Sequence, residues 1–305
     1  MPVFNFKHAI FSGFQGYLAP AKINLFLHIV GQRSDGYHLL QTFFCLVDLY
    51  DTIYLKICDN PQINRVNEIK NVSEVDDLCV RAAKLLQAYT NCQQGVQIAI
   101  KKHIPMGGGL GGGSSDAATV LMSLNNLWQC GLSREELQIL GLKLGADVPF
   151  FIYGQNAWAE GIGEQFQPLV VPKKYYVLIT PDINVNTSEV FASEQLTKNT
   201  NPMTMLDFSE AVKTSKVFFG GKFSNTLEIL VRKKYSDIDV CLKVLANVAT
   251  PRMSGSGATV FAEFDTETLA RNALLLTKAE LTKVGIVLKL AIVVCSLHQH
   301  PSFVV

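Results

Sequence analysis

The most informative segment of this 305-residue chain reads Pro105-Met106-Gly107-Gly108-Gly109-Leu110-Gly111-Gly112-Gly113-Ser114-Ser115. Six glycines within seven positions are costly in backbone entropy, so they indicate positive φ angles or a close approach of the backbone to another group. The segment follows an alternating strand pattern at 96–100 and leads into a helical stripe of apolar residues that begins at Ala117. Because a helix start offers unpaired N–H groups and the positive end of its dipole, the segment predicts an anion cradle, most naturally for phosphates.

The serine pair that ends this loop extends the prediction, because the hydroxyls of Ser114 and Ser115 could contact a phosphate or Mg²⁺. Two common phosphate-binding motifs do not fit. No Gly-Lys-Ser or Gly-Lys-Thr ends the loop, and the loop is too long for the dinucleotide-binding fingerprint, which also needs an acidic residue downstream. A flexible linker is the alternative reading, but linkers seldom open directly into an amphipathic helix.

A strand is predicted at 21–30, where residues alternate between two faces. One face holds Ile23, Leu25, Leu27 and Ile29, and the other holds Lys22, Asn24, Phe26 and His28. On this pattern Lys22 and Asn24 point the same way, with their Cα atoms about 6.6 Å apart.

Asp147 follows a helical pattern at 133–144 that begins with a capping box of Ser133 and Glu136. Taken singly, Asp147 is an ordinary helix cap with Pro149 in the first turn, and Lys22 is an ordinary solvated strand residue. Beside a phosphate cradle the pair has a second reading. Phosphoryl transfer to an alcohol needs a carboxylate that accepts the hydroxyl proton and cations that stabilise charge on the transferred group.

Composition limits the protein class. Hydrophobic residues make up 48% of the chain and charged residues 17%, which excludes intrinsic disorder. Lys and Arg number 27 against 26 Asp and Glu, and this neutral balance argues against a nucleic-acid binder. There is no apolar run of 18 residues and no secretory signal, so we expect a cytoplasmic protein without a membrane partner.

Cysteine and histidine spacing predicts no metal site built by the protein alone. The seven cysteines are odd in number and scattered, so we interpret them as reduced core residues. The six histidines show no paired spacing typical of zinc sites.

The interleaving of strand and helix patterns predicts a layered α/β or α+β fold. Composition shifts at 160–174, where Gly161, Gly163, Pro168 and Pro172 gather. We therefore expect two domains, 1–165 and 166–305.

Several motifs together resemble the GHMP kinases, a family that includes galactokinase, homoserine kinase and mevalonate kinase. The 105–115 loop resembles their ATP loop, and two further motifs match, Pro20-Ala21-Lys22-Ile23-Asn24-Leu25 and Ser254-Gly255-Ser256-Gly257-Ala258. The likeness is greatest to the members that phosphorylate a cytidyl methylerythritol diphosphate. The segments that carry this closer likeness are Asp35-Gly36-Tyr37-His38, 144–151 and 159–164.

The resemblance implies an α+β (two-layer α/β) GHMP kinase fold with the active site between the domains. The first domain would be ribosomal S5 domain 2-like and would bind ATP. The second would be ferredoxin-like and would complete the substrate cleft, and the extreme C-terminal strand could return to the first domain.

The implied reaction transfers the γ-phosphate of ATP to the 2-hydroxyl of the cytidyl methylerythritol diphosphate, in the non-mevalonate isoprenoid precursor pathway. ATP is the co-substrate, and Mg²⁺ would be held largely by ATP and water. The partners would be these small molecules, without nucleic acid or membrane, and the chain would be a monomer or weak homodimer. Two alternatives stay open: a kinase of another small alcohol, of the homoserine or mevalonate type, and a non-catalytic nucleotide-binding module.

The resemblance also implies roles for single residues. Asp147 would be the catalytic base and Lys22 its electrostatic partner, while Asn24 would orient the acceptor hydroxyls. The other substrate-binding residues would be Tyr37 and Phe191, which sandwich the cytosine, His38, which reads its edge, and Thr187, which supports that pocket. The ATP-binding residues would be Lys102, against adenine or ribose, with Pro105, Met106, Gly107, Gly108, Gly109, Leu110, Gly111, Gly112, Gly113, Ser114 and Ser115.

Without the resemblance, several of these residues have plainer readings. Tyr37 and Phe191 would be core aromatics, and Lys102 a solvated strand end. Three features depart from the family pattern. Asp77 stands where relatives often have Asn near the adenine, and the chain before Pro20 is longer than expected. The segment Asn225-Thr226-Leu227-Glu228 stands where relatives often have Asn-Asp-Leu-Glu, a difference to which we assign no function.

Overall fold

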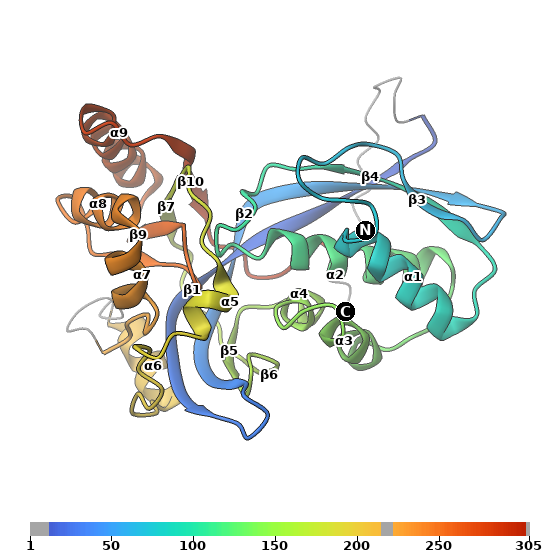
Figure 1. Ribbon diagram of the computed structural model, residues 1–305, viewed down its shortest axis with the longest axis horizontal. Helices are drawn as coiled ribbons and strands as arrows, with labels where there is room; N and C mark the ends of the chain where they lie inside the picture. Colours follow the sequence, from blue (N-terminus) through green and yellow to red (C-terminus); the bar gives the residue numbers. More distant parts are fainter. Residues whose placement is uncertain (1–11, 215–221, 303–305) are drawn as a thin grey trace.

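The computed structural model describes residues 12–214 and 222–302 (Figure 1). Two β-sheets, each covered by helices, lie side by side, and the long strands β1 and β2 run from one part toward the other. This confirms the expected α+β architecture. In the described ranges, no helix has the length and apolar character needed to cross a membrane.

The first sheet has the order β3-β4-β2-β5-β6, with β1 paired to β2, and only β3 and β4 run parallel. Its strands are β1 Gln15–Gln32, β2 His38–Cys58, β3 Ile63–Arg65, β4 Gly95–Lys101, β5 Ala157–Glu160 and β6 Gln165–Pro168. The segment just before Pro20 therefore belongs to β1 from Gln15 onward, while residues 1–11 lie outside the described part of the chain.

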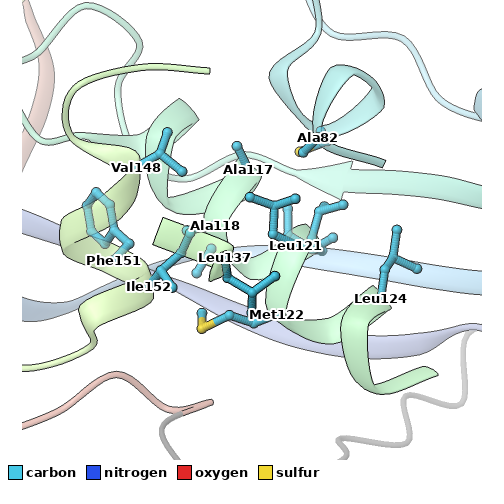
Figure 2. Packing of buried hydrophobic residues seen from close by; sticks show 14 of the residues in the cluster. Ala82, Ala117, Ala118, Leu121, Met122, Leu124, Leu137, Val148, Phe151 and Ile152 are labelled. Carbon is cyan, nitrogen blue, oxygen red and sulfur yellow. The ribbon is translucent and has the colours of Figure 1, made fainter. Parts of the chain in front are cut away.

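Four helices pack on this sheet: α1 Leu78–Thr90, α2 Gly112–Leu127, α3 Arg134–Leu142 and α4 Val148–Tyr153. The middle of α2 is buried among the others, and Figure 2 shows its apolar side chains Ala117, Leu121 and Leu124 inside that core. The predicted apolar stripe of α2 is thus confirmed. The capping box that starts α3 is also confirmed, since the Ser133 hydroxyl accepts from the Glu136 N–H and the Glu136 carboxylate from the Ser133 N–H.

The second sheet is antiparallel with the order β10-β7-β9-β8. Its elements are β7 Tyr175–Pro181, α5 Thr187–Phe191, α6 Met205–Lys213, α7 Glu228–Lys234, α8 Ser236–Leu245, β8 Pro251–Met253, β9 Val260–Phe264, α9 Glu267–Lys283 and β10 Leu288–Cys295. Strands and helical segments follow one another as β-α-β-β-α-β, which with this strand order is the ferredoxin-like arrangement. The expected fold of the second half is therefore confirmed.

The division between the sheets falls slightly later than the sequence indicates. β6 continues the first sheet to Pro168, and β7 opens the second at Tyr175, so a boundary after 165 cuts through β6. β1 also touches the second half directly. The Leu27 N–H donates to the Ser224 carbonyl, and the Leu27 carbonyl accepts from the Thr226 N–H.

The simple alternation expected at 21–30 is interrupted. The pairing of β1 with β2 shifts register between Asn24 and Leu27, a β-bulge type of irregularity. As a result Leu27, rather than Phe26, lines the same cavity as Lys22 and Asn24. β1 is also buried on both faces over much of its length, because helices cover one side and the second sheet the other.

Only some of the cysteines are core residues, although the sequence predicts this for all seven. All seven are free thiols; Cys45, Cys79 and Cys241 are buried, and Cys58, Cys92, Cys130 and Cys295 are half-buried.

After β10 the chain returns to the first half of the molecule. The Leu297 N–H donates to the Leu46 carbonyl at 2.8 Å, and the His300 N–H donates to the Gly154 carbonyl at 2.8 Å. The His300 ring is buried, and its Nδ1 accepts from the Ser302 N–H at 3.0 Å. The returning segment is thus 296–302, beyond β10, which itself pairs with β7.

The buried His300 ring predicts that the protein loses stability in acid. Burial, with the Arg134 charge adding to it, lowers the pKa of His300 to about 3. The folded protein therefore binds fewer protons here than the unfolded chain, whose histidine titrates near 6.5. The neutral ring's contribution is complete above pH 6.5 and is lost as pH falls toward 3. We expect urea unfolding at pH 7 and pH 5 to show a smaller acid loss for His300→Gln than for the unchanged protein; equal losses would contradict this.

Candidate active site

Asp147 lies at the start of α4, but its carboxylate does not cap the helix. The Oδ2 atom is instead 3.4 Å from Lys22 Nζ on β1, and about a third of the Asp147 side chain is open to solvent. Asp147 therefore occupies the N-cap position of a short helix with Pro149 in its first turn, as the plain reading expects, but its side chain makes no capping hydrogen bond. A pyrrolidine ring at the second helical position, Pro149, suits the first turn without a side-chain cap.

Lys22 is not a solvated strand residue, since only 3% of it is exposed. Its Nζ donates to Asn24 Oδ1 at 2.7 Å, and the Asn24 amide donates to Thr42 Oγ1 at 2.9 Å. The ammonium also lies 5.3 Å from the centre of the Phe44 ring. These contacts fix the cation beside the Asp147 carboxylate, which is left with an open side toward the cavity.

The glycine loop is held from two directions. The Lys22 N–H donates to the Leu110 carbonyl at 3.0 Å, and the Thr259 N–H donates to the Gly108 carbonyl at 3.1 Å. The Ser254 hydroxyl donates to the Gly109 carbonyl at 2.9 Å. Segments from β1 and from the second sheet therefore fix its carbonyl groups.

Glycine is required where this loop passes those segments. Gly109 has a φ of +72°, and a Cβ there would lie 2.2 Å from the Ser254 carbonyl oxygen. Helix α2 begins at Gly112, ahead of the apolar stripe that the sequence indicates from Ala117, with Gly111 at its cap and no capping side chain. The first N–H groups of α2 have no partner within the helix, so the structure supports the predicted anion cradle.

Two cavities meet at this loop. The first has a volume of about 850 Å³ and the second about 380 Å³. Residues Gly107, Gly109, Gly111 and Ser114 line both. Asp147 and Lys22 line the first, so the carboxylate and the predicted phosphate cradle share one space.

The remaining loop residues divide between the cavities and the core. Pro105, Met106, Gly108, Gly112 and Gly113 line the second cavity. Leu110 and Ser115 are buried and line neither cavity. The hydroxyl of Ser115 is therefore turned away from the space where the sequence analysis expected it to contact phosphate.

The residues expected around a pyrimidine also line the first cavity. The His38 and Phe191 rings lie 5.6 Å apart, and His38 Nε2 is 2.9 Å from the Phe191 carbonyl oxygen. That contact makes Nε2 the donor and leaves Nδ1, which is buried without a hydrogen bond among the described residues, as an acceptor. Tyr37 is 60% exposed at the hairpin tip, and the Thr187 hydroxyl is 2.7 Å from that of Ser256.

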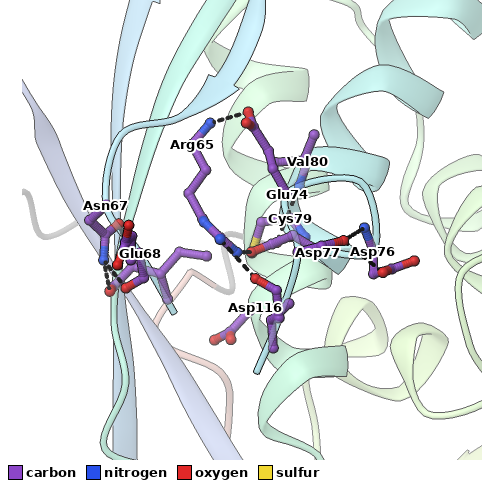
Figure 3. A network of polar contacts seen from close by, with 12 residues as sticks. Arg65, Asn67, Glu68, Glu74, Asp76, Asp77, Cys79, Val80 and Asp116 are labelled. Atoms are coloured by element: carbon purple, nitrogen blue, oxygen red, sulfur yellow. Dashed lines mark hydrogen bonds and ion pairs between the residues drawn. The ribbon is translucent and has the colours of Figure 1, made fainter. Parts of the chain in front are cut away.

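Lys102 is not a solvated strand end. Its Nζ forms ion pairs with Asp51 and with Asp116, the latter at 2.6 Å, while the side chain lines the second cavity. Asp77, near the same cavity, caps α1 and forms an ion pair with Arg65 at 2.6 Å (Figure 3). Asp77, which stands where relatives often have Asn, therefore has a structural role at the start of α1.

Sequence reasoning missed several polar residues of the first cavity. Thr42 orients Asn24, and Gln32 and Lys198 lie at the cavity wall with Lys198 Nζ 3.4 Å from Gln32 Oε1. Lys198 stands in a polar stretch with no periodic pattern. Only the fold brings it to this cavity, so no local signal could have identified it.

The chain is similar to known kinases both in sequence and in fold. The family model for the N-terminal domain of GHMP kinases matches residues 77–155 of this chain. The chain is 49% identical over 260 residues to the 4-diphosphocytidyl-2-C-methyl-D-erythritol kinase of Thiobacillus denitrificans, covering 85% of this chain and 90% of that relative. A crystal structure of 4-(cytidine 5'-diphospho)-2C-methyl-D-erythritol kinase matches with a TM-score of 0.77 and 30% identity, over 92% of this chain and 98% of the other. A homoserine kinase from Cytophaga hutchinsonii matches with a TM-score of 0.73 over 98% of each chain, but at 15% identity it shows a shared fold alone.

Proposed function

The chain belongs to the family of 4-diphosphocytidyl-2-C-methyl-D-erythritol kinases within the GHMP kinases, and we propose that it transfers the γ-phosphate of ATP to the 2-hydroxyl of 4-diphosphocytidyl-2-C-methyl-D-erythritol. The reaction would supply the non-mevalonate isoprenoid precursor pathway. One observation carries the proposal: Asp147, the glycine loop and the Tyr37–His38–Phe191 group line a single cavity.

Asp147 is proposed as the base that takes the proton of the acceptor hydroxyl. Its carboxylate faces the cavity and is oriented by the Lys22 ammonium at 3.4 Å. Lys22, held by Asn24, places positive charge next to the transferred group, where charge must be stabilised in phosphoryl transfer. Asn24 lines the same cavity wall, where it would orient the acceptor hydroxyls.

The donor site would combine the second cavity with the glycine loop. The N–H groups at the start of α2 suit the phosphates of ATP, and the side chain of Ser114 lies where both cavities meet. Bound Mg²⁺ would neutralise charge on the β- and γ-phosphates. Among the residues that the structure describes, no group of three acidic, histidine or cysteine side chains could hold a metal. Phosphate oxygens and water would therefore supply most of its ligands, as Mg²⁺ prefers.

The acceptor site would hold the cytidyl group between Tyr37 and Phe191. His38, whose ring lies beside that of Phe191 at the cavity wall, would read the cytosine edge through hydrogen bonds. Thr187 supports this wall through Ser256. Lys198 lies at the same cavity, and we infer that its ammonium neutralises the acceptor's diphosphate.

The function is tested by ADP release in the presence of three acceptors: the cytidyl methylerythritol diphosphate, homoserine and mevalonate. We expect turnover with the first alone, because a small alcohol leaves the aromatic–histidine pocket unfilled. Turnover with homoserine or mevalonate would favour a small-alcohol kinase. ATP binding without turnover of any acceptor would favour a non-catalytic module.

The cytoplasmic location and the monomeric or weakly dimeric state stay predictions from the sequence.

The stacking role predicts a selective defect in Tyr37→Ala. Stacking of a base on an aromatic ring contributes about 1–3 kcal/mol, so KM for the cytidyl acceptor should rise by about 10- to 100-fold. KM for ATP should stay unchanged, because Tyr37 does not line the second cavity. Steady-state kinetics with each substrate varied in turn checks this. Tyr89→Ala is the matched control, since Tyr89 is an exposed tyrosine on α1 that lines neither cavity. An equal rise in both KM values for Tyr37→Ala would contradict the assignment.

A further inference from the structure

A buried cluster of three charged side chains lies beneath the glycine loop. Asp51 comes from β2, Lys102 follows β4, and Asp116 stands in the first two turns of α2. Lys102 Nζ donates to Asp51 Oδ2 and, at 2.6 Å, to Asp116 Oδ2. The Asp51 side chain is fully buried and that of Asp116 is 5% exposed. One ammonium thus joins two carboxylates from different elements.

Asp51 also holds the backbone that leads into the loop. Its Oδ1 accepts from the N–H groups of His103, at 2.5 Å, and Ile104, at 2.9 Å. Ile104 immediately precedes Pro105, the first loop residue. At the start of the loop, the Asp51 carboxylate holds the backbone directly. At its end, the same carboxylate binds Lys102, which in turn binds Asp116 on helix α2. Both ends of the loop are therefore fastened to one group.

The electrostatics of the cluster show how strongly its members interact. Burial raises the pKa of Asp116 to about 8; Lys102 opposes this rise and Asp51 adds to it. Burial alone would lower the pKa of Lys102, but the two carboxylates raise it above its usual value. Burial, with the Asp116 carboxyl adding to it, raises the pKa of Cys79 on α1, which Figure 3 labels near Asp116. The ammonium is therefore firmly bound, while burial favours the protonated form of the Asp116 side chain.

We propose that Asp51 is a positioning residue for the nucleotide: by fixing both ends of the 105–113 loop, it holds the phosphate cradle in its binding shape before ATP arrives. A binding site ordered in advance loses less entropy when the ligand binds. Asp51 lines neither cavity, so it acts through the backbone and Lys102 rather than by contact with substrate. The inference rests on the proposed function only in taking ATP as the ligand of the loop.

The test variant is Asp51→Asn, which keeps the size of the side chain but loses its charge and replaces one acceptor oxygen by a donor. Hydrogen bonds to charged groups are strong, so we expect affinity for a non-hydrolysable ATP analogue to fall by about 10- to 100-fold. At saturating ATP, kcat should change by no more than about threefold, and KM for the acceptor should not change. Amide hydrogen exchange should become faster at 103–113. These shifts separate positioning from a merely structural role.

The control is Ser133→Ala, which removes the side-chain cap of α3 in the same half of the molecule. It should lower the melting temperature without changing nucleotide affinity or loop exchange. If Asp51→Asn lowers stability but keeps the analogue's affinity and the loop's exchange rates, the proposal is overturned.

Should Asp51→Asn fail to fold, Asp116→Asn gives the second measurement. It loosens the helix end of the fastening, and because Asp116 also lines the second cavity, the decisive expectation is faster exchange at 105–113, together with a several-fold fall in analogue affinity. Unchanged values there would also overturn the proposal. Analogue binding is measured without acceptor, so inactivity toward the cytidyl acceptor would contradict the proposed function and leave this inference standing.

Discussion

Asp147→Asn should lower kcat by about 10²–10⁴-fold, the usual contribution of a general base, with little change in KM for ATP or in melting temperature. An asparagine amide occupies the same space but cannot take a proton from the acceptor hydroxyl. The fold should tolerate the change, because the Asp147 carboxylate does not cap α4 and Lys22 keeps its hydrogen bond to Asn24. Steady-state kinetics and thermal unfolding of the variant measure both expectations.

Asp265→Asn is the matched control for this variant. Asp265 is an exposed carboxylate that also forms an ion pair with a lysine, Lys174, but lines neither cavity. The kcat of Asp265→Asn should stay within about twofold of that of the unchanged protein. A kcat near that of the unchanged protein in Asp147→Asn would remove the base assignment.

Lys22→Met extends the same test. Residues that act as a unit are strongly non-additive, so the double variant of Lys22 and Asp147 should be little slower than Asp147→Asn alone. A multiplication of the two single effects would show that Lys22 acts independently of Asp147.

Gly109→Ala should abolish binding of a non-hydrolysable ATP analogue at concentrations about 100-fold above the original dissociation constant. The new Cβ would lie 2.2 Å from a backbone oxygen of Ser254 and 3.0 Å from that of Gly257. The loop must then move away from the segment that holds it, and the cradle loses its shape. The left-handed backbone adds a strain of roughly 1–2 kcal/mol for any residue with a Cβ. Calorimetry with the analogue measures the loss.

Gly131→Ala separates the steric clash with Ser254 from the strain of a left-handed backbone. Gly131 has the same φ of +72° as Gly109, but a Cβ there meets nothing within 4 Å. It should lose a similar small amount of stability from the backbone and keep full nucleotide affinity. Unimpaired nucleotide binding in Gly109→Ala would show that the loop does not depend on its close contact with Ser254.

The glycine loop illustrates how far sequence reasoning reached in the site. Six glycines near a helix start are a local signal, and the cradle followed from general properties of helix ends. The alternation around Lys22 and Asn24 was sufficient to place those two side chains on one face. It failed at Leu27, because a register shift depends on the pairing of β1 with β2 rather than on the residues of β1 alone.

Burial was the main quantity that local patterns misjudged. Lys22 and Lys102 look like solvated strand residues, yet one is enclosed beside Asp147 and the other between Asp51 and Asp116. Ser115 looks like a second phosphate ligand, but α2 starts early enough to turn it inward. In each case the environment comes from segments far away in the chain.

The amino-acid sequence by itself determined the alternation of strands and helices, the glycine loop at a helix start, the residue types proposed for the reaction and, through several ordered motifs, the family. These features depend on backbone conformation and on residue type, which short segments encode. Only the tertiary structure decided that Asp147 turns from its helix toward Lys22, that Lys198 reaches the acceptor cavity, and that one buried carboxylate fastens both ends of the loop. Those outcomes are set by ion pairing and desolvation between distant segments, which exist only once the sheets and helices have packed.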